Sequence, residues 1–379
     1  MATVRPFRID VAEDVLTDLR TRLTRTRWPE SETVDDWSQG MPLAYTRELA
    51  GYWRDHYDWR AREAKLNRFA QFTTTIDELD IHFIHQRSPH PDAFPLLITH
   101  GWPGSVAEFP HVIGRLTDPT AYGARAEDAF DVVCPSLPGF GFSGKPTSTG
   151  WGVDAIARAW QTLMTRLGYR RYGAHGGDWG SVVTTALGRN PSGCAAIHLT
   201  MPVAAAPPRE DDGADSDSDA QALSRLDYYQ QWESGYQKQQ ATRPQTLGYG
   251  LVDSPVAQLA WIVEKFRSWM DCDGHPENAV SRDELLDNVM LYWVNGTGAS
   301  AARLYWESSG AAFASSAYVA IPTGVAAFPK EIIRCPRSWC DRVYNISHWT
   351  DMPRGGHFAA LEQPDLLVAD VRAFFATIR

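Results

Sequence analysis

The first ninety residues carry two kinds of apolar spacing. Between Val11 and Leu23 every fourth position is apolar, which predicts an amphipathic helix that buries one face. A second helix is expected over residues 43–57. Residues 72–76 and 79–85 alternate apolar with polar side chains around a short acidic turn, and this pattern predicts a β-hairpin. We therefore expect a helical arm that leads into the edge of a sheet.

Beyond this arm, short apolar runs alternate with helical patterns. The runs predict strands, because they are short and are bounded by glycine, proline or acidic turn residues. They occupy residues 94–99, 130–134, 195–199, 319–324 and 345–349, with helices expected over 155–167 and 364–375. Strands that alternate with helices indicate a mostly parallel sheet covered on both faces. The predicted fold class is therefore α/β.

A long insertion interrupts this alternation. It opens with an acidic, proline-flanked tract over 207–219, which we expect to be a mobile surface loop. The rest is helical in pattern, including a capping box at Ser281–Glu284. A helical block inserted between strands is typical of a cap over an active site. The expected units are an arm with a hairpin over 1–90, a first part of the core over 91–202, a helical cap over 203–316 and a second part of the core over 317–379.

Charge and cysteine content narrow the class of partner and the compartment. The 379 residues include 36 basic and 46 acidic side chains, so the net charge of −10 argues against nucleic acid or an anionic membrane surface as the main partner. The first residues lack the apolar core of a signal peptide, and no apolar run reaches membrane-spanning length. Five cysteines without a CxxC pair predict reduced thiols in the cytoplasm and no metal site. Fifteen tryptophans favour an aromatic pocket for an apolar ligand.

The candidate chemistry begins with the stretch Ala174–Ser181, of sequence AHGGDWGS. Glycines stand two positions before and two after Asp178, and a helical pattern follows. This is the pattern of a nucleophile elbow, a sharp turn that presents one side chain to a cleft. A carboxylate at that position can attack saturated carbon and form an ester that water later cleaves. A glycine-rich turn with an incidental Asp is the alternative, so the other site residues must decide.

A histidine and a second carboxylate follow in the order used by α/β-hydrolases, which is nucleophile, acid, histidine. His357 lies in a late glycine-rich segment before the last predicted helix, which suits a general base. Glu331 follows a predicted strand and is our first choice for the acid. Asp341 and Asp351 are rivals because each lies nearer to His357 in sequence. Asp341 follows no strand end and we place Asp351 on the histidine's own loop, so Asp351 is only the second choice.

Two backbone amides are candidates for binding an oxyanion. The strand predicted over 94–99 runs directly into His100-Gly101-Trp102-Pro103-Gly104, and such a turn can aim N–H groups at an anion. We expect the amides of Trp102 and Trp179 to take this role. His100 is interpreted as a structural residue that braces the turn.

Four segments together resemble the microsomal-type epoxide hydrolases. They are HGWP at 100–103, GGDWGS at 176–181, FPKE at 328–331 and RGGHFAALE at 354–362. The arm also resembles the N-terminal domain of that family in RPF at 5–7, RWP at 27–29 and YDWR at 57–60. Each motif alone is moderately specific, whereas the set spans nearly the whole chain. The resemblance implies an α/β-hydrolase fold with an N-terminal arm and an inserted cap.

The same resemblance implies a site and a reaction. Two cap tyrosines of the family hold the epoxide oxygen, and the segments ESGY and RLYWE place them at Tyr236 and Tyr305. The implied product is a vicinal diol, formed without metal or cofactor. The expected partner is a small-molecule epoxide that is apolar and carries an aryl or bulky group. We expect no nucleic-acid partner, no membrane anchor and a homodimer. Some bacterial members of this family serve secondary metabolism.

Three other readings of the residues remain open at this stage. Haloalkane dehalogenases share the Asp nucleophile and often a following Trp, as in Asp178-Trp179. They need halide-binding donors, commonly with Asn or Glu where Trp102 stands, and no paired cap tyrosines. A hydrolase fold without activity, used as a binding module, is a second alternative. A serine esterase is disfavoured because the elbow carries no serine.

Overall fold

The computed structural model describes residues 3–206, 217–308 and 317–379. The described residues form one sheet of nine strands in the order β1-β2-β3-β5-β4-β6-β7-β8-β9. The strands are β1 Arg5–Phe7, β2 Gln71–Ile76, β3 Leu79–Gln86, β4 Phe94–Thr99, β5 Phe130–Pro135, β6 Tyr172–Gly176, β7 Cys194–Leu199, β8 Val319–Ala327 and β9 Tyr344–Asp351. The hairpin and the later strands predicted from the sequence are thus confirmed, with ends that differ by a few residues.

The sheet is antiparallel at one edge and parallel elsewhere. β1, β2 and β3 pair antiparallel, and β3 joins β5 in the same sense. From β5 through β9 the neighbours are parallel, as predicted. β4 lies between β5 and β6. The chain therefore runs from β4 to β5 on one side and then returns past β4 to β6 on the other side. Ligands of open α/β sheets bind at the carboxyl ends of strands beside such a switch point.

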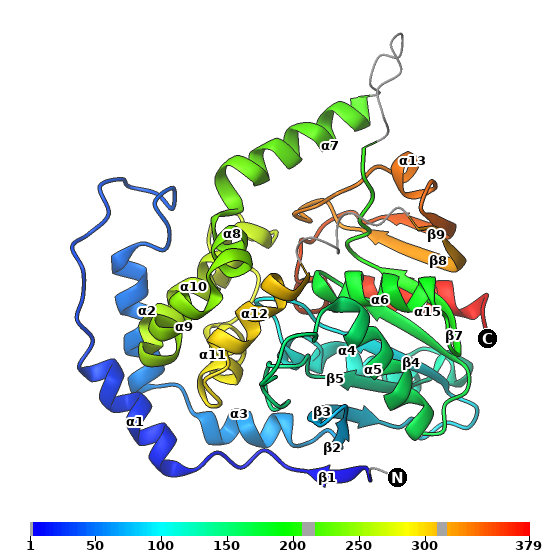
Figure 1. The fold of residues 1–379 in the computed structure, drawn as a ribbon, viewed down its shortest axis with the longest axis horizontal. Coiled ribbons are helices and arrows are strands. Elements are labelled where there is room, and N and C mark those ends of the chain that lie inside the picture. The colour runs from blue at the N-terminus through cyan, green and yellow to red at the C-terminus, as the bar shows by residue number, and fades with distance from the viewer. Residues whose placement is uncertain (1–2, 207–216, 309–316) are drawn as a thin grey trace.

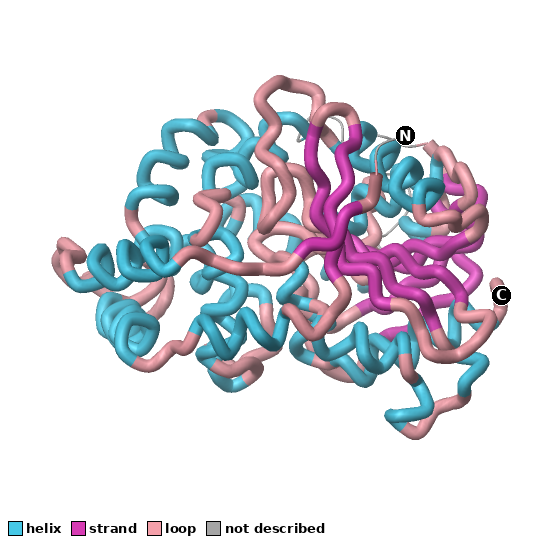
Figure 2. The backbone as a smooth tube through the Cα atoms, turned by 90° about the horizontal axis from the view of Figure 1, so that it is seen from below, coloured by secondary structure: helices cyan, strands magenta, loops and turns pink. Residues whose placement is uncertain are grey.

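Helices cover the parallel strands because their apolar faces are buried against the sheet. The covering helices are α4 Pro110–Thr117, α5 Val153–Arg166, α6 Trp179–Arg189 and α15 Pro364–Ala376. Ten of the eleven residues of α6, from Trp179 to Gly188, are buried, so this helix lies in the core rather than on it. The strands occupy one side of the molecule, whereas the other side contains helices and loops alone (Figure 2).

The helical side consists of the arm and the inserted helices. The arm contains α1 Glu13–Thr24, α2 Leu43–Asp55 and α3 Trp59–Leu66, and the insertion contains α7 Asp217–Tyr228, α8 Gly235–Thr242, α9 Pro244–Asp253, α10 Pro255–Trp269, α11 Arg282–Trp293 and α12 Gly298–Ser308. The arm lies along the inserted helices (Figure 1). Arg62 of α3 donates to Asp287 of α11 at 2.8 Å from Nε, and the Tyr57 hydroxyl donates to the same carboxylate at 2.8 Å. This largely buried cluster joins the arm to the inserted helices.

The acidic tract differs from the prediction where it is described. Residues 207–216 lie outside the described ranges, but Asp217 and Asp219 belong to the first turn of α7. The expectation of a loop up to residue 219 is therefore wrong at its end. Acidic side chains stabilise the first turn of a helix through the helix dipole, so a run of Asp residues also begins helices.

Candidate active site

The turn between β6 and α6 places Asp178 at its apex. Asp178 has φ 51° and ψ −129°, a conformation that residues with a side chain rarely adopt. The positions two before and two after it must be glycine: a Cβ on Gly176 would lie 2.2 Å from the carbonyl oxygen of Gly180, and one on Gly180 would lie 1.9 Å from that of Thr99. The tight packing of the turn therefore holds a strained residue in one orientation.

Two groups contact the Asp178 carboxylate. The backbone amide of Trp102, in the turn after β4, donates to Oδ1 at 2.8 Å. Nε2 of His357 lies 3.5 Å from Oδ2. A Cβ on Gly101 would lie 2.2 Å from Oδ1, so this turn can approach the carboxylate only because it carries glycine. Trp179, whose amide was the second candidate, is the first residue of α6 and directly follows Asp178.

His357 is oriented by a buried glutamate. Nδ1 of His357 donates to Oε1 of Glu331 at 2.5 Å, and the backbone amide of Ile332 donates to the same oxygen at 2.7 Å. Burial by itself lowers the pKa of His357, but the negative charges and hydrogen bonds of Glu331 and Asp178 outweigh it and raise that pKa well above its usual range. The edge of the Trp269 ring packs on the imidazole, with ring centroids 5.0 Å apart.

The two rival carboxylates lie elsewhere. Asp351 is the last residue of β9, not a residue of the histidine's loop as we expected, and it pairs with Arg334 at 2.8 Å with 67% of its side chain exposed. Asp341 is exposed and lies 3.7 Å from Arg337. The strand β8 continues to Ala327, which brings Glu331 to the carboxyl edge of the sheet beside His357. The geometry therefore pairs His357 with Glu331.

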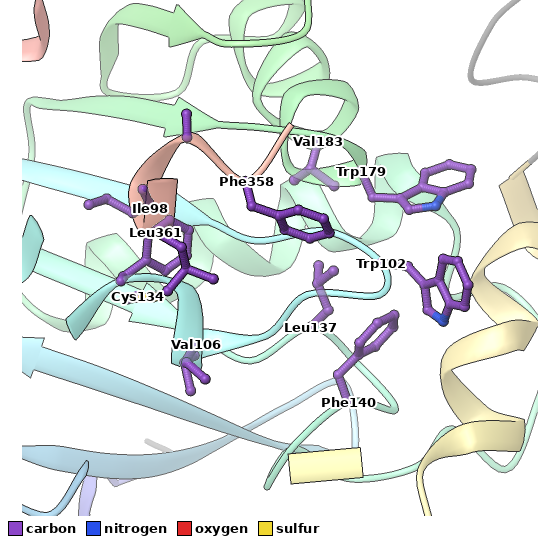
Figure 3. Packing of buried hydrophobic residues seen from close by; sticks show 14 of the residues in the cluster. Ile98, Trp102, Val106, Cys134, Leu137, Phe140, Trp179, Val183, Phe358 and Leu361 are labelled. Atoms are coloured by element: carbon purple, nitrogen blue, oxygen red, sulfur yellow. The ribbon is translucent and has the colours of Figure 1, made fainter. Parts of the chain in front are cut away.

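Two buried tyrosines of the inserted helices lie in the same region. The rings of Tyr236, on α8, and Tyr305, on α12, lie 5.8 Å apart, and the indole of Trp102 stacks on Tyr236 at 4.8 Å. The ring of Trp179 packs edge-on against Tyr305 at 4.8 Å. Both indoles lie at the edge of the core that faces the cap helices (Figure 3). Burial, followed by neighbouring negative groups that include Asp178, raises the pKa of both phenols well above its usual range, so both remain protonated donors at neutral pH.

His100 braces the turn, as predicted. Its Nδ1 donates to the carbonyl oxygen of Gly101 at 2.9 Å, and its Nε2 accepts from the amide of Leu137 at 3.1 Å. Burial lowers its pKa to about 4, so the ring is neutral. With both ring nitrogens occupied by backbone groups, His100 has a structural role.

Comparisons with known proteins show which family has this fold and sequence. Residues 4–109 match the family described as the epoxide hydrolase N terminus, and residues 95–245 match the alpha/beta hydrolase fold. A Stigmatella aurantiaca protein, provisionally named an epoxide hydrolase, is 52% identical over 99% of this chain and 86% of its own length. Epoxide hydrolase 1 of Sus scrofa is 36% identical over 99% and 89% of the two chains. The solved structure of Aspergillus niger epoxide hydrolase superposes with a TM-score of 0.89 at 33% identity, over 100% of this chain and 97% of that one.

The chain belongs to the epoxide hydrolases. This membership confirms the resemblance, the α/β-hydrolase fold and the hydrolase class, and it does not favour the dehalogenase reading. In the described ranges, no helix has the length and apolar character needed to span a membrane. The same residues contain no group of three His, Cys, Asp or Glu side chains that could hold a metal ion.

Two further residues of this epoxide hydrolase lie at the site and were not identified from the sequence. The hydroxyl of Tyr229 lies 2.8 Å from that of Tyr236 and donates to Gln237 Oε1 at 3.0 Å. Glu108 lines the cavity next to Asp178. Two sequence signals were available. Tyr229 stands seven residues before Tyr236, and Glu108 is the single acidic residue in the apolar stretch after Gly104. Neither signal alone distinguishes a site residue from an ordinary surface or core position.

Proposed function

We propose that the chain opens an epoxide in two steps through an ester on Asp178. The observation that carries this proposal is the carboxylate at the elbow, with His357 and Glu331 on one side and two buried phenols on the other. A carboxylate is a competent nucleophile toward a strained ring, and the ester that results is a substrate for water.

In the first step, one oxygen of Asp178 attacks a ring carbon while the bond from that carbon to the epoxide oxygen breaks. The oxygen leaves with the electron pair and takes a proton from Tyr236 or Tyr305. A phenol, with a reference pKa of about 10, is acidic enough to protonate a developing alkoxide. Because Trp102 N–H already holds Oδ1, we assign the attack to Oδ2 and expect Oδ1 to become the ester carbonyl oxygen.

In the second step, His357 removes a proton from water, and the hydroxide attacks the ester carbonyl carbon. Formation of the ester removes the negative charge of Asp178, one of the groups that raise the pKa of His357. The pKa of the imidazole therefore falls after alkylation, and the ring becomes free to act as a base. The amides of Trp102 and Trp179 stabilise the tetrahedral oxyanion, where loss of one donor typically costs about a hundredfold or more in rate. Collapse releases the diol and restores Asp178.

The expected substrate is an apolar epoxide with an aryl or bulky substituent. Five aromatic rings form a connected cluster that reaches His357, namely Trp102, Trp179, Tyr236, Tyr305 and Trp269. Aromatic walls with a few convergent polar groups suit a flat apolar ligand.

The intact mass of a His357→Gln protein after brief exposure to racemic styrene oxide tests this function. We expect a gain of one substrate mass, since alkylation does not need the base and hydrolysis does. A second change, Asp178→Ala, should abolish the gain. If the histidine variant shows no adduct and turns over at the wild-type rate, the assignment of His357 and the covalent mechanism are wrong.

We also propose a compartment, a role for the inserted helices and the arm, a metabolic role and an oligomeric state. All five cysteines are free and buried, which supports a reducing cytoplasmic setting. We further propose that residues 203–316 act as the cap and residues 1–90 as the arm that supports it, that the natural epoxide belongs to secondary metabolism, and that the enzyme is a homodimer. Light scattering of the purified protein tests the last point, and a panel of bulky against small epoxides tests the substrate class.

A further inference from the structure

Resting on the proposed two-step reaction, we infer that Glu108 holds the water that hydrolyses the Asp178 ester. Glu108 ends the 3₁₀-helix Val106–Glu108, four residues after the turn that carries Trp102. The cavity that it lines is also lined by Asp178 and His357. The carboxyl group is thus the third functional group beside the nucleophile and the base.

The cavity has the size and chemistry for a water molecule. Its volume is about 20 Å³, which exceeds the roughly 10–15 Å³ that one water needs. A buried water also needs between two and four polar partners. The lining offers polar side chains in His357, Glu108 and Thr200. Glu108 is mostly but not fully buried, as expected for a side chain that forms a cavity wall.

The backbone of the preceding turn leaves room for this carboxyl group. A Cβ on Gly104 would lie 1.6 Å from Oε1 of Glu108, so any larger residue at 104 would displace the carboxyl. Gly104 does not need glycine for its backbone conformation, because its φ is not positive. The absence of a side chain at 104 therefore serves the position of Glu108.

The surroundings keep Glu108 protonated near neutral pH. Burial raises the pKa of its carboxyl to about 8; His357 opposes this, the negative charge of Asp178 adds to it, and a hydrogen bond with the Ser105 backbone opposes it. Tyr292 and Cys134 are further titratable groups that interact with it, and both remain neutral because burial raises their pKa. No ion pair involves Glu108 among the described residues. A neutral carboxyl can both donate to and accept from one water.

The hydrolytic step then balances with the phenolate left by ring opening. The water oxygen bonds to the ester carbonyl carbon, and one water proton goes to Nε2 of His357. The bond between that carbon and the alkyl oxygen breaks, and the alkyl oxygen takes the proton from His357. The second water proton, left on the Asp178 carboxyl, returns to the phenolate, which restores the carboxylate and the phenol. Glu108 keeps its own proton throughout and orients the lone pair of the water toward the carbonyl carbon.

The test separates the two steps by single-turnover kinetics with styrene oxide, followed by tryptophan fluorescence and rapid-quench mass spectrometry. For Glu108→Leu we expect alkylation within about threefold of wild type and ester hydrolysis slower by tenfold to a hundredfold, the scale of a misplaced reactant. Glu108→Gln keeps both a donor and an acceptor and should restore most of the hydrolysis rate. If Glu108 had a purely structural role, Glu108→Leu would slow alkylation and hydrolysis together. Glu108→Gln would then not restore hydrolysis selectively.

Two more variants keep the result interpretable. Gly104→Ala displaces the carboxyl without altering Glu108 and should slow hydrolysis in the same way, with little further loss when combined with Glu108→Leu. Glu127→Leu, at an exposed glutamate of another 3₁₀-helix, is the matched control and should leave both steps unchanged. Hydrolysis at the wild-type rate in both Glu108→Leu and Gly104→Ala overturns the inference. Failure of wild-type protein to form an ester on Asp178 would instead overturn the proposed function.

Discussion

Replacement of Glu331 by glutamine isolates what the buried carboxylate contributes to the base. Oε1 of Glu331 accepts the 2.5 Å hydrogen bond from Nδ1 of His357, and the two side chains are only 2% and 3% exposed. Water therefore screens the pair weakly. Two unit charges about 4 Å apart interact by roughly 4 kcal/mol at an effective dielectric constant near 20. The imidazolium formed while water is deprotonated loses this stabilisation in Glu331→Gln.

An energy of roughly 4 kcal/mol corresponds to about a thousandfold in rate. We expect ester hydrolysis to slow by that order, whereas alkylation of Asp178 changes little because it needs no base. The change also removes the negative charge that keeps the pKa of His357 high. The pH at which hydrolysis reaches half its maximal rate should therefore shift downward. Glu331→Asp keeps the charge and should recover part of the rate.

The assay is the decay of the alkyl-enzyme in single-turnover experiments between pH 5 and pH 9, with racemic styrene oxide as substrate. Asp351→Asn is the control, because Asp351 is exposed and pairs with Arg334. It should hydrolyse the ester at the wild-type rate. The reasoning is refuted if Glu331→Gln hydrolyses normally, and a loss confined to Asp351→Asn would move the role of the acid to that residue.

Three further changes test the cap, the elbow and the arm. Tyr305→Phe removes one proton donor and should slow alkylation by about tenfold to a thousandfold while ester hydrolysis stays the same, as rapid-quench mass spectrometry would show. Gly180→Ala forces a Cβ to within 1.9 Å of the carbonyl oxygen of Thr99, so we expect a fall in Tm and little soluble protein. Arg62→Met leaves Asp287 largely buried without its cation and should cost about 3–5 kcal/mol in urea unfolding; an unchanged midpoint would show that the arm does not hold the cap through this pair.

Local features of the chain were sufficient to predict the elements and the nucleophile. Apolar period and turn residues are properties of a few neighbouring positions, so strands at 94–99 and 130–134, and a parallel sheet, could be predicted from them; the observed strands span 94–99 and 130–135. The elbow is also local, since Gly176 and Gly180 are needed by the same sharp turn that carries Asp178. The order of Asp178 and His357 along the chain matches the α/β-hydrolase topology that the predicted strands indicate, so the histidine could also be proposed from the sequence.

Contacts between distant segments required the tertiary structure. Glu331 and Asp351 are both acidic and both precede His357. The two candidates are distinguished by the length of β8, which brings Glu331 to His357, and by the ion pair between Asp351 and Arg334. The places of Tyr229, beside Tyr236, and of Glu108, in the cavity with Asp178 and His357, likewise depend on contacts between distant segments. The spacing of a pattern specifies which face of an element is buried, but not which residues of other elements it meets, because that is decided by packing across the whole core.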